Sequence, residues 1–318
     1  MNLRLSLSVI IIALGLVSFP SCSINKTAMK LVGNALSSGT SGTAFTGDDD
    51  PELVGDALPF ALKLYESILE EVTDSPGLFL TAGSGFIMYA NAWVQGPADM
   101  LPDSEVDRKK AASVRAQKLY LRGRNYVLRG MELLHPGFTA SLDAETLKTP
   151  LAGMAVGDVP FLYWSAAGWM AAYATDPFDV DLGVGVKKAA AMMESALSLN
   201  ESWGEGSIHE FFISYYGSLP RSMGGSEEKA RLHFAKAVEF SKGLKASPYV
   251  SLASTVSVSN QNMKEYRELL EKALAIDVNA RPANRLANVL AQRKARWLLD
   301  HRGDRILSNT KEEGEEEE

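Results

Sequence analysis

Residues 189–197 (AAAMMESAL), 230–238 (ARLHFAKAV) and 266–274 (YRELLEKAL) repeat one pattern of small and large apolar side chains three times. The pattern occupies positions i, i+3, i+4, i+7 and i+8, which lie on one face of a helix. Its central alanines are Ala196, Ala237 and Ala273. They are 41 and 36 residues apart, a spacing that brackets the period of helix-turn-helix repeats. The three stretches therefore predict an all-α fold built from helix pairs.

The repeated pattern resembles the second helix of a tetratricopeptide repeat, in which small residues at i and i+7 flank a large apolar residue at i+4. Small residues let a partner helix approach closely. Upstream, Trp164, Ala167 and Gly168 resemble the Trp-x-x-Leu-Gly signature that opens the first helix of such a repeat. The resemblance implies tetratricopeptide-like helical repeats, and the loop 176–181 is expected to be an insertion within them.

The chain has 318 residues, of which 46% are hydrophobic and 22% charged, a globular composition. We expect a helical repeat domain over residues 56–303 and an acidic, disordered tail over residues 304–318. The apolar spacing predicts helices over 59–72, 78–94, 104–134 and 159–173. Gly83 and Gly85 lie inside the second of these helices, where they indicate close contact with another helix or a local kink.

The formal net charge is −7 and the pI is about 5.3, which argues against nucleic acid as a partner. Basic residues are concentrated in one place, between Arg108 and Arg129 on the predicted helix 104–134. This concentration is either a solvated helix face or a docking face for an acidic partner or for lipid headgroups.

Residues 1–21 are typical of a signal peptide, because their apolar run over 5–17 is too short for a membrane span. The end of this segment resembles a bacterial lipoprotein cleavage site, with Ser21 before Cys22, the single cysteine of the chain. The resemblance implies lipidation of Cys22, so that acyl chains alone hold the mature protein on a membrane surface. The alternative is an ordinary signal peptide with an incidental cysteine. Residues 22–55, rich in Gly, Ser, Thr and Asp, are expected to form a flexible, lipid-anchored tether.

The sequence contains no recognisable catalytic set. His209 and Glu210 begin like a zinc-protease motif, but Ile213 stands where the second histidine ligand must be. One loop holds three aspartates, Asp176, Asp179 and Asp181. That loop lacks the glycine and the distal glutamate of an EF-hand. We therefore expect no enzyme, no cofactor and no metal; an envelope hydrolase that uses Glu210 or the three aspartates is an alternative.

Two of the predicted helices, 78–94 and 159–173, combine aromatic side chains with isolated polar groups. Buried tyrosine and tryptophan need partners for their O–H and N–H groups, and an apolar, partly wet pocket is one way to supply them. Core packing is the alternative for any single residue. As a group, we expect these side chains to line a ligand pocket: Asn91, Trp93, Tyr163, Trp164, Trp169 and Tyr173.

The lipoprotein-like start, the helical repeats with an insertion, the segment 89–92 and the tryptophan-rich helix 160–173 together resemble the T component of tripartite ATP-independent periplasmic (TRAP) transporters, called TatT. The resemblance runs from about Asp56 to Asp300. It implies a periplasm-facing lipoprotein without catalytic residues that forms a homotrimer and docks the substrate-binding P subunit. It also implies that small, hydrophobic ligands pass through an apolar cavity or pore. The alternative function is a purely protein-binding, tetratricopeptide-like scaffold of the cell envelope.

Overall fold

The computed structural model describes residues 42–142 and 151–307 of the chain. Every regular element within these ranges is a helix, which confirms the expected all-α fold. The expected signal peptide, the lipidation site Cys22, most of the expected tether and the C-terminal glutamate run lie outside the described residues.

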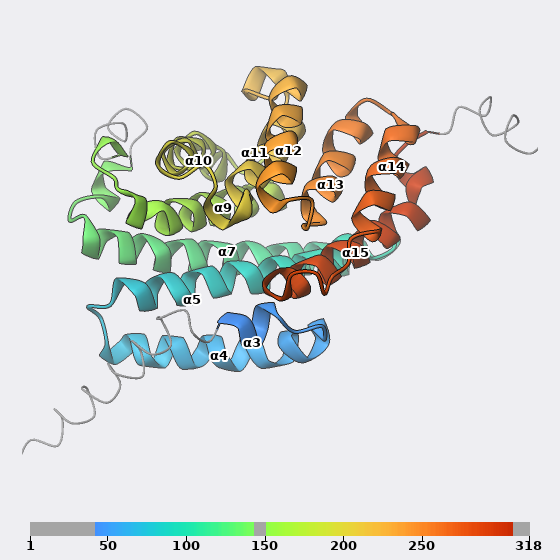
Figure 1. Cartoon of the computed structure of the whole chain (residues 1–318). Helices are drawn as coiled ribbons and strands as arrows, with labels where there is room; N and C mark the ends of the chain where they lie inside the picture. The colour runs from blue at the N-terminus through green and yellow to red at the C-terminus, as the bar shows by residue number, and fades with distance from the viewer. Residues whose placement is uncertain (1–41, 143–150, 308–318) are drawn as a thin grey trace, which may run out of the picture.

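Long helices form the first part of the described chain, preceded by one short helix. Figure 1 shows the long helices stacked one above another across the molecule, with the short one beside the lowest. In chain order they are α3 (Gly42–Thr46), α4 (Pro51–Glu71), α5 (Pro76–Tyr89) and α7 (Val106–Leu134).

The start of α4 is fixed by a cap that lies upstream of the predicted helix 59–72. The carboxylate of Asp50 accepts a hydrogen bond from the N–H of Leu53 at 3.0 Å, and Pro51 occupies the first turn, where its missing N–H costs nothing. Pro59, expected at a helix start, therefore lies inside α4. The predicted start was wrong because the stronger capping signal is Asp50 followed by Pro51.

The next helix also departs from the predicted span of 78–94. It begins at Pro76, where the hydroxyl of Ser75 accepts from the N–H of Leu78 at 3.4 Å. Its later part changes into a π-helical segment, η1 (Ala90–Gln95), before the short α6 (Gly96–Asp99). A π-helical turn holds more residues than an α-helical one, so it changes which side chains face the core.

Consecutive helices pack as pairs in the second part of the chain. The three copies of the repeated pattern fall on the second helix of each pair, and their central alanines are fully buried. The pairs are α9 (Val159–Thr175) with α10 (Val180–Leu199), α11 (Ser207–Ser218) with α12 (Glu227–Ser241), and α13 (Ser247–Leu252) with α14 (Met263–Leu274). A last long helix follows, α15 (Arg285–Asp300). Short helices complete the described chain: η2 (Thr139–Ser141), η3 (Val156–Asp158), η4 (Trp203–Glu205), η5 (Arg221–Met223), the π-helical η6 (Ala253–Ser257), η7 (Pro282–Asn284) and η8 (Arg302–Asp304).

Glycines bring α5 and α7 into close contact. A Cβ atom added to Gly83 would lie 2.5 Å from Val127 Cγ2 and 2.6 Å from the carbonyl oxygen of Gly123. One added to Gly123 would lie 2.6 Å from the carbonyl oxygen of Gly83. The two backbones therefore touch where neither residue has a side chain, which is the close contact that Gly83 predicts.

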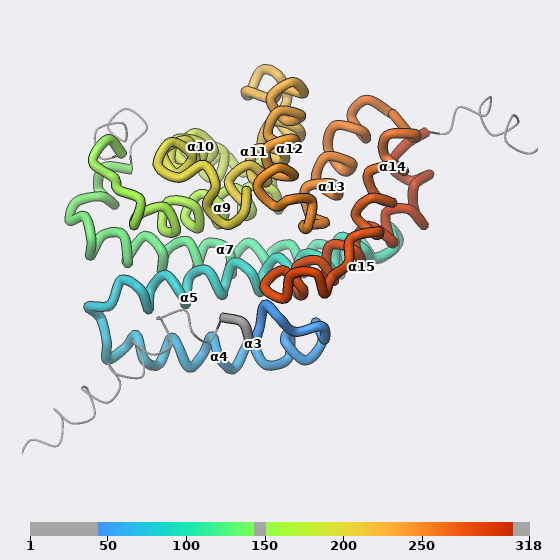
Figure 2. The backbone as a smooth tube through the Cα atoms, viewed as in Figure 1, coloured from blue at the N-terminus to red at the C-terminus, as the bar shows by residue number. Residues whose placement is uncertain are grey.

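The first and last helices of the described chain meet. Figure 2 shows the chain returning so that α15 lies near α3 and the start of α4. The Arg285 guanidinium donates to the carbonyl of Gly47 at 2.9 Å, and Arg293 pairs with Glu52 at 2.7 Å. We call these two contacts, Arg285 with Gly47 and Arg293 with Glu52, the terminal clasp. Beyond α15 the packed core extends as far as Ile306, which is 1% exposed.

Candidate functional site

Three aromatic side chains from α9 and η4 pack together at the middle of the molecule. The ring of Tyr163 meets the edge of Trp164 at 5.2 Å between centroids and lies 4.5 Å from the ring of Trp203. Both tryptophans are only half-buried. We call these three residues the aromatic wall.

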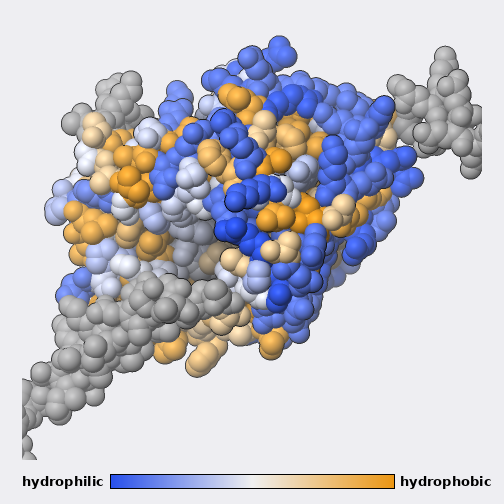
Figure 3. All heavy atoms as spheres, in the orientation of Figure 1, coloured by the Kyte–Doolittle hydropathy of each residue, from blue (hydrophilic) through white to orange (hydrophobic). Residues whose placement is uncertain are grey.

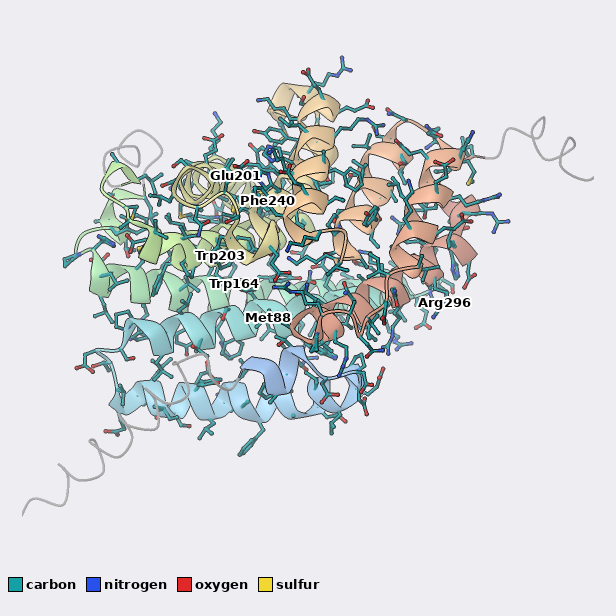
Figure 4. The ribbon with its side chains drawn as sticks, viewed as in Figure 1. Met88, Trp164, Glu201, Trp203, Phe240 and Arg296 are labelled. Atoms are coloured by element: carbon teal, nitrogen blue, oxygen red, sulfur yellow. The ribbon has the colours of Figure 1, made fainter. Side chains whose placement is uncertain are left out.

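The aromatic wall borders a hollow on one face of the molecule. Figure 3 shows this face hollowed between the α9–α10 pair and α15. Figure 4 shows Trp203, Trp164 and Met88 following one another along the same region, with Phe240 above them. Met88 is 42% exposed, although it is a large apolar side chain. The hollow thus presents aromatic and thioether surface, which suits an apolar ligand.

A polar network lies behind the aromatic wall. Lys245 Nζ donates to Glu210 Oε1 at 2.8 Å, to Ser207 Oγ at 2.9 Å and to the carbonyl of Gly204 at 2.7 Å. Ser247 donates to the other oxygen of Glu210 at 2.5 Å. Burial first, and then the negative charge of Glu210, raises the pKa of the Tyr163 phenol. Tyr163 is therefore a neutral phenol next to an ion pair whose hydrogen bonds are satisfied.

Two of the predicted ligand residues lie elsewhere on α9. The ring of Trp169 has the Arg124 guanidinium 4.5 Å from its centroid and covers Gly185 of α10, where an added Cβ would lie 1.6 Å from the indole nitrogen. Tyr173 is 8% exposed and belongs to an apolar cluster with Tyr120, against which Trp164 also packs. Trp169 and Tyr173 are thus packed between helices and share core neighbours with the aromatic wall.

The remaining two predicted ligand residues belong to the π-helical segment η1. Trp93 donates its indole N–H to the carbonyl of Pro51 at 2.7 Å and covers Gly55 of α4. Asn91 donates to the hydroxyl of Tyr120 at 3.4 Å, and that hydroxyl donates to Gln95 at 2.6 Å. Of the six residues predicted to line a pocket, the structure therefore brings Tyr163 and Trp164 together at the hollow and distributes the others over three packing contacts.

A model of the family described as "TRAP transporter T-component" matches residues 47–305, most of the chain. The chain belongs to the T-component family of TRAP transporters. An uncharacterized protein of Treponema pallidum (strain Nichols) is similar, with 37% identity over 266 residues that cover 83% of this chain and 82% of the relative. The family match confirms the resemblance seen in the sequence. As a T-component, the protein belongs to a transport system and associates with it.

Two further properties of this T-component bear on its site. Among residues 42–142 and 151–307, no helix is long and apolar enough to cross a membrane. In the same ranges, no three histidine, cysteine, aspartate or glutamate side chains converge as a metal site requires.

A buried histidine, His209, and a half-buried one, His233, join α11 and α12 of this T-component. The Nδ1 atoms of His209 and His233 are 2.8 Å apart, so one nitrogen must carry a hydrogen and the other must accept it. Glu201 Oε1 lies 3.5 Å from His209 Nε2, which is buried and makes no hydrogen bond within the described residues. Burial lowers the pKa of each histidine to about 4, helped for His209 by Lys236 and for His233 by His209.

Sequence reasoning missed Trp203 as a member of the site. The residue lies in the segment 200–206, which contains two glycines and connects α10 to α11. A large aromatic side chain in such a turn-rich connection, directly after a copy of the repeated pattern, was an available signal. Met88 gave no such signal, because its position within an apolar helix does not show that it is exposed.

Proposed function

We propose that this T-component is a non-enzymatic, periplasmic lipoprotein that docks the substrate-binding P subunit and handles small, hydrophobic ligands through an apolar cavity. The observation that carries the ligand part is the aromatic wall, because half-buried tryptophans at a hollow leave apolar surface for a ligand to cover. Tyr163 and Trp164 are the proposed ligand contacts at this hollow. Asn91, Trp93, Trp169 and Tyr173 stay as proposed contacts of a path that extends beyond it.

The anchoring and assembly of the protein follow the family resemblance. We propose lipidation at Cys22 after removal of residues 1–21. The expected tether (22–55) is then shortened at its end, because α3 and the start of α4 belong to the helical body, and the expected acidic tail (304–318) begins only beyond the buried Ile306. The body then stands at a periplasm-facing membrane surface and forms a homotrimer. Removal of the anchor should leave the trimer intact if helix packing, rather than the lipid, holds it together.

The experiment that tests ligand handling is native mass spectrometry of the purified protein before and after mild organic extraction. We expect a small co-purifying mass that extraction removes, and an oligomer peak of three copies. Trp164→Ala and Trp203→Ala should each reduce the fraction that carries the small mass. Trp297→Ala, on α15 and stacked on His301 at 4.5 Å, is the matched control and should retain it.

The outcome that contradicts the ligand role is a clean apoprotein that still assembles. Urea unfolding of each variant separates loss of ligand from loss of fold.

A pure scaffold is the second candidate, and the packing of Trp93 and Trp169 against glycines of neighbouring helices favours it. The scaffold predicts that the P subunit co-purifies as well with Trp164→Ala as with the unaltered protein. If less P subunit co-purifies with Trp164→Ala although the variant is as stable as the unaltered protein, the aromatic wall takes part in docking. That outcome argues against a scaffold that works without the aromatic wall.

A further inference from the structure

Three arginines at heptad spacing on α7 each lie over an aromatic ring of α5. Arg115 lies 5.9 Å from the ring centroid of Tyr89, Arg122 lies 5.3 Å from that of Phe86, and Arg129 lies 4.6 Å from that of Phe79. Tyr126 stacks between the last two rings, 5.9 Å from Phe86 and 6.2 Å from Phe79. We call the three arginines and their rings the arginine ladder.

The rings hold the guanidinium groups in place but do not neutralise them. A guanidinium over a ring keeps its N–H groups free at the edge, so it remains a donor for carboxylates. Two arginines of the ladder, Arg122 and Arg129, line a groove of about 440 Å³ on α7 together with Lys118. The three arginines span 14 residues of helix, or about 21 Å.

The ladder is short of acidic partners. Glu66 lies 3.6 Å from Arg122 and also accepts from the hydroxyl of Tyr126 at 2.8 Å. Among the residues that the structure describes, no carboxylate lies within ion-pairing distance of Arg115, Lys118 or Arg129. In a chain of net charge −7, this is an unbalanced row of positive charge.

The described chain ends on the side of the molecule where the helix that carries this row begins (Figure 1). In agreement with this placement, the pKa of Asp103, just before α7, is lowered by a hydrogen bond from Lys109 and also by the charge of Arg305. Residues 308–318 follow, and six of the last seven residues are glutamates. Eleven residues reach about 36 to 40 Å when extended, and Asp103 to Arg129, the far end of the ladder, is about 39 Å along the helix.

We propose that the glutamate run 312–318 docks in extended form on the arginine ladder of its own chain. Seven extended residues span about 23 Å, which matches the length of the ladder. The row is narrow and follows one helix, and α4 beside it carries several glutamates, so it fits an acidic strand of chain better than a flat anionic membrane. The tail then competes with any acidic partner for this face. The inference does not rest on the proposed function.

The test compares the purified protein with a variant in which all six glutamates of residues 312–318 are replaced by glutamine. Phenylglyoxal modifies accessible arginines, and peptide mass spectrometry gives the rate for each one. At low salt we expect Arg115, Arg122 and Arg129 to react about fivefold more slowly in the unaltered protein than in the glutamine variant. Arg267 and Arg296, exposed on α14 and α15, are the matched controls and should react equally in both.

Varying the salt and the protein concentration shows which acidic segment or surface binds the arginine ladder. In about 0.5 M NaCl the difference should vanish, because screening weakens exposed ion pairs. Protection by the chain's own tail is independent of protein concentration from about 1 to 100 µM. Protection that rises with concentration would assign the ladder to the tail of a second copy and overturn the proposal. Equal rates in the two proteins at low salt would overturn it too, and vesicles with anionic lipid that protect both proteins alike would assign the ladder to a membrane instead.

Discussion

Gly123→Ala should destabilise the protein at the contact between α5 and α7. The added Cβ would lie 2.6 Å from the carbonyl oxygen of Gly83, 2.7 Å from Ile87 Cγ1 and 3.2 Å from the backbone nitrogen of Ile87. Two of these three atoms belong to the backbone, so no side-chain rotation relieves the overlap and the helices must separate. Overpacking of this kind costs about 3 kcal/mol, and the better helix propensity of alanine offsets about 1 kcal/mol. The expected net loss is about 2 kcal/mol.

Gly183→Ala is the matched control, because Gly183 also lies inside a helix but an added Cβ meets nothing within 4 Å. This variant should gain up to about 1 kcal/mol from helix propensity alone. Urea unfolding followed by circular dichroism at 222 nm measures both variants. The difference between them, about 3 kcal/mol, isolates the steric term. An unfolding midpoint of Gly123→Ala equal to or above that of the unaltered protein would refute the close-contact argument.

Three further outcomes can be measured in the same way. The pKa of buried His209 is about 4 in the folded state and near 6.5 in the unfolded state, so the unfolded state binds more protons, and His209 alone should lower the free energy of unfolding by about 2 kcal/mol from pH 7 to pH 5. The variant His209→Phe with His233→Leu should flatten this pH dependence, and an unchanged slope would exclude the pair as its source. Gly185→Ala should displace Trp169 and lower the free energy of unfolding by about 2 kcal/mol, but by much less when Trp169→Leu is also present. Equal losses with and without Trp169→Leu would contradict the contact between the two residues. Asn288→Leu should lower the free energy of unfolding by about 3 kcal/mol, because the N–H of Ala246 and the carbonyl of Leu244 lose the Asn288 side chain as their partner, at 3.0 and 2.9 Å. A loss below about 1 kcal/mol would mean that these two groups find other partners.

The sequence was sufficient for the parts of the fold that depend on helical periodicity. The repeated pattern predicted which helices are second in their pairs, because small residues at a helix face specify close packing wherever they occur. Gly83 predicted a close helix contact for the same reason. The π-helical segments η1 and η6 were not predicted, because the apolar spacing used to predict helices assumes the α-helical period throughout.

The candidate site was harder to predict than the fold. Trp93, Trp164 and Trp169 look alike in the sequence, since each stands among apolar neighbours in a predicted helix. What distinguishes them is the residue opposite: Gly55 and Gly185 receive two of the rings, whereas Trp164 borders the hollow. Such pairings join two different helices, so periodicity within one helix carries no information about them.

The terminal clasp has a consequence for the order of folding. Arg285 and Gly47 are 238 residues apart, so the contact closes a loop that includes almost the whole described chain. The contacts of α15 with Gly47 and Glu52 form only when the last long helix has been made and has reached its place, whereas the Asp50 cap of α4 is local. A chain interrupted before residue 285 would keep the cap but lack the clasp, and proteases acting on a nascent or truncated chain would meet this less protected end first.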